Sequence, residues 1–187
     1  MSISSTTRAT VADLYREEGK AELIAGRIVN FMPVSRRHNR IAFKIARSLD
    51  DFAEAEGRGE VYTDNMGFVV AELSSGRESF SPDASYYAGP FLDDPARFIS
   101  AAPTFAIEVR SESDRGPAAL RQLSENRRDY FEAGTLVVWD VDPIAKVVTS
   151  YISTDPDHPR VFHLGEIADA EPAVPGWRMD VGQIFTE

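Results

Sequence analysis

The chain has 187 residues, of which 43% are hydrophobic and 27% are charged, and its formal net charge is −10. This length suits one domain with a real hydrophobic core, so we expect residues 1–187 to form a single domain. The negative charge opposes non-specific binding to nucleic acid, because that binding depends on Lys and Arg neutralising phosphates. The absence of cysteine excludes disulfides and cysteine-ligated zinc, and three scattered histidines argue against a histidine-rich metal site.

No apolar run approaches the roughly 20 residues that cross a bilayer, so the sequence predicts no membrane segment. The first residues, "MSISSTTRATVADLY", lack the apolar centre of a secretory signal. Together with the absence of cysteine, this is typical of a cytoplasmic protein, which is the location we expect.

In chain order, a short helix is predicted over 11–18. The segment "AELIAGRIVNF" then predicts a hairpin that turns at Ala25 and Gly26. From Ser35 to Glu56 the apolar residues recur with the helical period, with Ser35 as the N-cap and Gly57 as the stop.

Further along, strand-like segments at 60–73 and 79–89 flank a polar turn, and a buried strand follows at 104–111. A second long helix begins near Pro117 and stops at Gly134. Three more strands are predicted, at 135–143, 146–153 and 160–165, before a closing segment, "GWRMDVGQIF". Two long helices among many strands, few of them in βαβ order, predict an α+β fold with a mixed β-sheet, an N-terminal hairpin and additional C-terminal strands.

The strand "TFAIEVRS" carries a carboxylate at its centre. Alternation places Phe105 and Ile107 on one face, and Glu108 and Arg110 on the other. A carboxylate in a core strand is costly unless a partner compensates it. One interpretation is that Glu108 and Arg110 simply flank each other on a half-exposed strand; the other is that Glu108 belongs to a functional site.

Four acidic residues stand out on or beside predicted strands: Glu22, Asp83, Glu108 and Asp140. Two carboxylates on neighbouring strands suit a hard cation such as Mg²⁺, which takes oxygen ligands and keeps several waters. The pattern therefore allows a magnesium-type site, although buried carboxylates also occur in structural ion pairs.

The first long helix has two notable faces. A basic stripe, able to contact a phosphate backbone or to be an ordinary solvated face, consists of Arg36, Arg40, Lys44 and Arg47. His38 projects into the opposite, apolar stripe, where a histidine is more often a hydrogen-bonded core residue than a ligand. On the second long helix Arg127 projects inward and Asn126 lies beside it, and an inward arginine requires a carboxylate or phosphate partner.

The segments "SPDASYY", "FAIEVRSESD" and "RRDYFEAGTLVVWDVDP", with "AELIAGRIV" and "SRRHNRIA" upstream, resemble the Uma-two family of putative restriction endonucleases. That family belongs to the PD-(D/E)XK nuclease superfamily, and the likeness runs from about Glu22 to Pro143. The resemblance implies a restriction-endonuclease-like fold with a metal site at one end of a mixed sheet. It implies that Asp83 and Glu108 bind Mg²⁺ or Mn²⁺, that Glu22 is an accessory acid and that His38 approaches the same site.

The superfamily uses a lysine to position or activate the attacking water, and here the sequence departs from the pattern. The ordinary lysine position, two after the glutamate, holds Arg110. The position that the Uma-two family uses instead, four before the Tyr of the second helix, holds Asn126. An arginine can stabilise an anion but cannot act as a base, so Arg110 or Arg127 would substitute electrostatically.

Three functions remain open at this point. The first is a metal-dependent endonuclease that hydrolyses DNA, acting as a homodimer as many nucleases of this fold do. The second is a catalytically degenerate nuclease fold that binds a nucleic acid or a protein. The third is a hydrolase that uses paired carboxylates on a small substrate without a metal.

Overall fold

The computed structural model describes residues 8–91, 94–111 and 114–186. The strands of the main sheet are β3 (Glu60–Thr63), β6 (Ala84–Tyr87), β7 (Phe105–Val109), β8 (Val137–Asp142), β9 (Val147–Ile152) and β10 (Asp155–Phe162). They lie in the order β10-β9-β8-β7-β6-β3. Only β7 and β8 are parallel to each other among these neighbours, so the sheet is mixed, as predicted.

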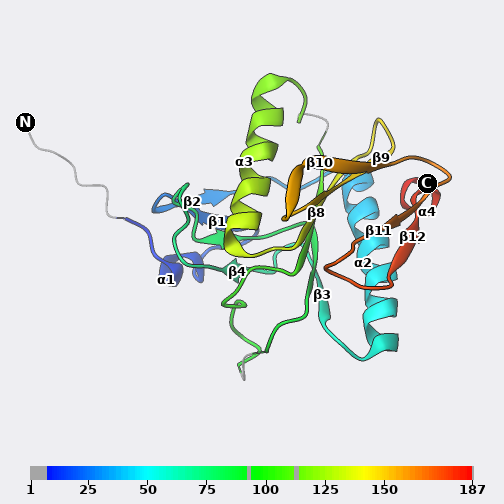
Figure 1. Cartoon of the computed structure of the whole chain (residues 1–187). Helices are drawn as coiled ribbons and strands as arrows, with labels where there is room; N and C mark the ends of the chain where they lie inside the picture. Colours follow the sequence, from blue (N-terminus) through cyan, green and yellow to red (C-terminus); the bar gives the residue numbers. More distant parts are fainter. Residues whose placement is uncertain (1–7, 92–93, 112–113, 187) are drawn as a thin grey trace, which may run out of the picture.

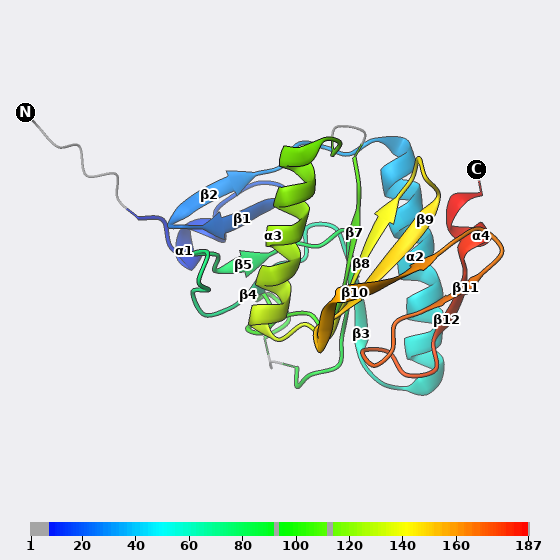
Figure 2. The same ribbon diagram turned by 45° about the horizontal axis from the view of Figure 1, so that its top comes forward.

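Two long helices cover opposite faces of this sheet (Figures 1 and 2). The first, α2 (Arg36–Glu56), packs on one face, and α3 (Pro117–Ala133) crosses the other face on its way from β7 to β8. The α+β prediction is therefore confirmed. The crossover through α3 is what makes β7 and β8 parallel, because parallel neighbours need a long connection.

Both ends of α2 form as the sequence predicts. The Ser35 hydroxyl accepts a hydrogen bond from the backbone N–H of His38 (3.3 Å), which satisfies one of the free amide groups at the helix start. Gly57 ends the helix with φ of 64°, a left-handed conformation that glycine adopts without a side-chain clash.

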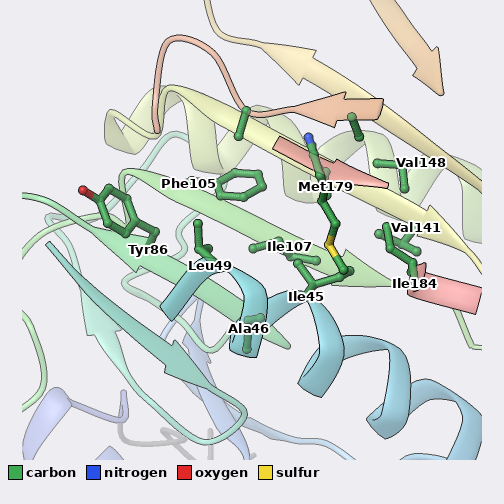
Figure 3. Close-up of a cluster of buried hydrophobic side chains, with 14 of the residues drawn as sticks. Ile45, Ala46, Leu49, Tyr86, Phe105, Ile107, Val141, Val148, Met179 and Ile184 are labelled. Carbon is green, nitrogen blue, oxygen red and sulfur yellow. The ribbon is translucent and has the colours of Figure 1, made fainter. Parts of the chain in front are cut away.

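The larger hydrophobic core lies between α2 and the sheet (Figure 3). Ile45 and Leu49 of α2 face Phe105 and Ile107 of β7. Three further elements from the end of the chain complete this core: β11 (Ile167–Asp169), β12 (Arg178–Asp180) and α4 (Val181–Phe185). The strands predicted from the sequence ended at residue 165, so β11, β12 and α4 were all missed; α4 begins because Asp180 caps it by accepting from the Gly182 N–H (2.7 Å).

The α3 face carries the N-terminal elements. These are α1 (Val11–Leu14), the hairpin of β1 (Ala21–Ile24) and β2 (Arg27–Asn30), and the pair β4 (Phe68–Val69) and β5 (Ser79–Phe80). The hairpin turns at Ala25 and Gly26, as predicted, and both have positive φ, 50° and 68°. Positive φ at both central positions is the geometry that matches the twist of two antiparallel strands.

Several predicted boundaries were wrong. The strand-like segment 79–89 contains two separate strands, β5 and β6, and the strand expected at 160–165 belongs to β10, which begins at Asp155. The helix expected over 11–18 ends at Leu14, and Gly19 with φ of 93° lies in the turn that leads to β1. The segment 60–73, expected to be one strand-like stretch, contains two separate strands. They are divided by a turn in which Asn65 has φ of 73°, so the pleat cannot continue through it.

Candidate active site

Asp83 and Glu108 lie on neighbouring antiparallel strands at almost the same level. Ala84 stands opposite Ile107 in the β6–β7 register, so the next pair along consists of Asp83, just before β6, and Glu108. The link is direct, because the Val109 N–H donates to Asp83 Oδ2 (2.9 Å). Asp83 is buried and Glu108 partly buried. The fold thus brings together the two carboxylates for which a metal role was predicted.

Glu108 is held by α3. Its Oε1 accepts hydrogen bonds from the Tyr130 hydroxyl (2.7 Å) and from Asn126 Nδ2 (3.2 Å). Glu108 does not pair with Arg110, whose guanidinium binds Asp140 instead. Asn126, at the family's lysine position, therefore contacts the glutamate, and its own Oδ1 is buried without a hydrogen-bond partner among the described residues.

Arg110 and Arg127 converge on Asp140 of β8. Arg110 binds it through two bonds, Nε to Oδ1 (2.6 Å) and Nη2 to Oδ2 (2.8 Å), while Arg127 Nη1 lies 3.4 Å from Oδ2. Arg127 also stacks over the Tyr151 ring at 3.9 Å. Because Glu108 and Asp140 are neighbours in the parallel β7–β8 register, this ion cluster lies beside Glu108. The inward Arg127 thus has the carboxylate partner that its position requires.

A lysine that the sequence analysis missed lies in the centre of the site. Lys20, directly before β1, places Nζ 2.8 Å from Asp83 Oδ1 and 2.8 Å from Asp64 Oδ1. Its side chain is only 14% exposed. Lys20 is one of three lysines in the chain. Its position two residues before Glu22, at the start of a buried strand, was the feature of the sequence that could have indicated a role in the site.

His38 reaches the site from the first turn of α2. Its Nε2 lies 2.9 Å from Asp83 Oδ2. The ring N–H is not aligned for a hydrogen bond, and neither ring nitrogen has a hydrogen-bond partner among the described residues. We therefore treat the contact as an electrostatic one. His38 is buried and faces inward, as its helical position predicted, and it touches the metal-site candidate Asp83.

Glu22 stands one layer behind these residues. It forms an ion pair with Arg77, which also binds Asp129 of α3 (Nε to Oδ2, 2.9 Å), and all three residues are buried. The second oxygen, Oε1, accepts from the Ser81 N–H (2.9 Å), two residues before Asp83. The predicted accessory acid therefore supports the chain segment that carries Asp83, and its charge is compensated by Arg77.

The two central carboxylates titrate in opposite directions. Burial, joined by repulsion from Asp83, raises the pKa of Glu108 from 4.5 to about 8. Burial alone would also raise the pKa of Asp83, but contacts with His38 and Lys20 outweigh it and lower that pKa below 3.8. Burial tends to lower the pKa of Lys20, yet Asp83, Glu108 and Asp64 raise it above 10.5. At neutral pH the site thus holds an ionised Asp83, a protonated Glu108 and an ammonium.

The oxygens present suit a hard cation. A divalent ion replacing the proton of Glu108 would compensate the charge of both carboxylates in their ionised form, and Asn126 Oδ1, which has no hydrogen-bond partner among the described residues, is a polar atom beside them. No group of three or more His, Asp or Glu side chains suited to a metal occurs within the part of the chain that the structure describes. An ion here would therefore depend on two carboxylates, with water or substrate oxygens as further ligands.

A basic groove opens next to this site. It has a volume of about 690 Å³, and its cationic lining residues are Arg36, Arg37, Arg40, Lys44 and Lys146. A cavity of about 10 Å³, lined by His38 and Arg110, shares Ser35 and Arg37 with the groove. Of the predicted basic stripe, three members line the groove, whereas Arg47 is exposed further along α2 and does not.

A mixed sheet between two helices, with an acidic site where β6 and β7 meet, is the architecture of a restriction-endonuclease-like fold. The chain resembles the crystal structure of a putative nuclease belonging to DUF820 from Anabaena variabilis ATCC 29413, with a TM-score of 0.74. The likeness covers 94% of this chain and 97% of that chain at 17% sequence identity, so it shows the fold. The α+β, restriction-endonuclease-like prediction is confirmed.

The family follows from the sequence itself. A family model described as "Uma2: Putative restriction endonuclease" matches residues 9–182, and the chain belongs to this family. The resemblance inferred from its motifs is thereby confirmed. No curated protein matches the chain. Within the described residues, no helix has the length and apolar character needed to cross a membrane.

Proposed function

We propose that this protein is a metal-dependent endonuclease that hydrolyses DNA phosphodiester bonds, with Asp83 and Glu108 holding Mg²⁺ or Mn²⁺. One observation carries the proposal. Two carboxylates stand at adjacent positions of neighbouring strands, and burial, joined by repulsion from Asp83, raises the pKa of Glu108 to about 8. Such a pair favours replacement of the proton on Glu108 by a cation, and nucleases of this family provide the matching chemistry.

Hydrolysis forms a bond from a water oxygen to phosphorus and breaks the bond from phosphorus to the leaving sugar oxygen. The water loses one proton and the leaving oxygen gains one. An ion held by Asp83 and Glu108 would supply charge neutralisation and would lower the pKa of a water molecule. The chain's own residues arrange the site: Asn126 and Tyr130 orient Glu108, while the Val109 N–H and His38 hold Asp83.

The remaining predicted residues have supporting roles in this proposal. Glu22 holds the segment before Asp83 through the Ser81 N–H. Arg110, fixed by Asp140, lines the cavity next to His38 and adds positive charge where the basic groove meets the site. The DNA backbone would lie along that groove, because its cations compensate phosphate charge on an otherwise acidic protein.

A second function, a catalytically degenerate fold that binds nucleic acid or protein, is favoured by one observation. Neither lysine position of this superfamily holds a lysine. One holds Arg110, which binds Asp140, and the other holds Asn126, which binds Glu108. The two functions share a fold and a groove, so cleavage itself separates them. A hydrolase that works without metal would be distinguished from both, because its activity would not change when EDTA removes the metal.

The test is nicking of supercoiled plasmid in Mg²⁺, in Mn²⁺ and in EDTA, with wild type beside Asp83→Asn and Glu108→Gln. We expect cleavage by wild type in at least one metal, none in EDTA, and a loss of about 100-fold or more in both variants, because each loses an ionic metal ligand. Arg160→Met, which removes an exposed ion pair on β10, controls for purification artefacts. Equal inactivity of all proteins in both metals would count against the nuclease proposal and favour the binding function.

A further inference from the structure

We infer that Lys20 is the active-site cation of this nuclease, supplied by the entry to β1 instead of by β7 or α3. This inference rests on the proposed function. In metal-free protein the Lys20 ammonium lies between Asp83 and Asp64; with substrate bound, it stabilises negative charge on the reacting phosphate.

The contacts of Lys20 are those of a residue built into the site. Nζ is 2.8 Å from one oxygen of Asp83 and 2.8 Å from one oxygen of Asp64, which lies in the turn after β3. Backbone pairing fixes the main chain of Lys20, because the Phe31 N–H donates to the Lys20 carbonyl (2.9 Å) at the end of the hairpin. A side chain only 14% exposed and held by two carboxylates is unlike an ordinary surface lysine.

The other cations around the site have structural carboxylate partners. Arg110 and Arg127 bind Asp140, and Arg77 bridges Glu22 and Asp129. Among the described residues, the basic side chain of lysine or arginine type that contacts Asp83 is that of Lys20. It therefore provides the ammonium that the sequence lacks at both positions where this superfamily carries one.

A second groove borders the segment that carries Lys20. This groove, of about 300 Å³, is lined by Gly19 and Ala21 on either side of Lys20 and by Ser81 two residues before Asp83. The Ser81 hydroxyl oxygen is buried and has no hydrogen-bond partner among the described residues. The backbone on either side of Lys20 and the segment that leads to Asp83 thus border the same groove.

The chemical role is electrostatic. As the water oxygen bonds to phosphorus and the leaving sugar oxygen departs, negative charge accumulates on the phosphate oxygens. A fixed ammonium in a partly buried site stabilises that charge more than it stabilises the substrate, which lowers the barrier. Asp64 is then a positioning residue that aims Lys20.

The experiment compares wild type with Lys20→Met, Lys20→Arg and the exposed control Arg160→Met. Plasmid cleavage in Mn²⁺ gives kcat and KM, and calorimetric titration gives Mn²⁺ affinity without DNA. For Lys20→Met we expect kcat to fall about 100-fold with KM within about threefold, as for loss of one charge-stabilising donor. Lys20→Arg should retain more activity, since it keeps the charge. Mn²⁺ should bind Lys20→Met at least as tightly as wild type, because one cation no longer competes for Asp83.

Each other result counts against the inference. If Lys20→Met cleaves within threefold of an active wild type, Lys20 is not the cation, and the nuclease proposal stands without it. If kcat and Mn²⁺ affinity fall together, Lys20 only holds Asp83 in place, and the inference is overturned. If wild type cleaves in neither metal, the nuclease proposal fails, and the inference fails with it.

Discussion

Glu108 is held in place by two neighbouring side chains and also has a raised pKa. Its Oε1 is fixed by the Tyr130 hydroxyl and the Asn126 amide, so the carboxyl orientation is set before any ligand arrives. Burial of the carboxyl, joined by repulsion from Asp83, raises its pKa to about 8. Any metal must therefore displace a proton, which makes metal binding depend on pH.

The resulting prediction concerns Mn²⁺ affinity. Below pH 8 the metal-free site is protonated and binding releases one proton, so affinity should rise about tenfold from pH 6 to 7, and further up to pH 8. Above that pH the gain should stop. Calorimetry in two buffers of different ionisation enthalpy measures the proton release directly.

Glu108→Gln is the matched control for this titration, because it keeps the shape but carries no titrating carboxyl. We expect it to bind Mn²⁺ weakly at every pH and to release no proton. Equal wild-type affinity at pH 6 and pH 8 would contradict a direct role of Glu108 as ligand.

At the scale of elements, the site is assembled from segments that are distant in the chain. The buried set of Glu22, Arg77 and Asp129 joins the β1–β2 hairpin to the segment before β5 and to α3. This docking brings Lys20, at the hairpin entry, next to Asp83 at the entry to β6. The first turn of α2 contributes His38 from the opposite side of the sheet.

The groove beside α2 gives a prediction that separates two exposed arginines. Arg40 lines the groove and Arg47, although on the same predicted stripe, does not. For DNA binding in EDTA, Arg40→Ala should weaken affinity and reduce the slope of log K against log salt by about 1, the signature of one lost phosphate contact. Arg47→Ala should leave the slope unchanged. Fluorescence anisotropy at several salt concentrations measures both.

Equal effects of the two substitutions would mean that the whole stripe binds DNA as a solvated helix face. No effect from either would place the DNA elsewhere on the surface. These outcomes report on DNA binding and not on folding, because both side chains are exposed and their truncation removes charge without opening the core.

At the scale of the whole molecule, an aromatic cluster ties the end of the chain to the sheet. Trp177, just before β12, is 1% exposed. Its ring centroid lies 5.1 Å from that of Trp139 and 6.0 Å from that of Phe105. Its indole N–H donates to Ser48 of α2 (3.3 Å). The C-terminal segment therefore belongs to the main core on the face opposite to the carboxylate pair.

Trp177→Ala should lower the free energy of unfolding by about 3 to 5 kcal/mol, the usual cost of truncating a buried aromatic residue. Equilibrium denaturation in urea measures this, with Trp177→Phe as a milder control. A loss below about 1 kcal/mol would show that the cluster can collapse around the gap.

The homodimer that the family resemblance implies is a separate prediction, which light scattering tests.

Much of this protein can be predicted from its sequence, because local signals are strong. Ser35 and Gly57 mark both ends of α2, and the Ala25-Gly26 turn sets the hairpin. Alternation along β7 correctly separates Ile107 from Glu108. The order of motifs identifies the family, and with it the pair Asp83 and Glu108.

What only the tertiary structure decided is the partner of each charge. Periodicity reports which face of a strand or helix a residue occupies, but not which distant segment covers that face. Arg110 pairs with Asp140 and not with Glu108, because β8 lies parallel beside β7. Lys20 and Asp83, 63 residues apart, meet because the buried Glu22–Arg77–Asp129 set docks the hairpin against α3. Ion pairs across such separations leave no local pattern, so the ammonium in this site becomes visible only in the folded chain.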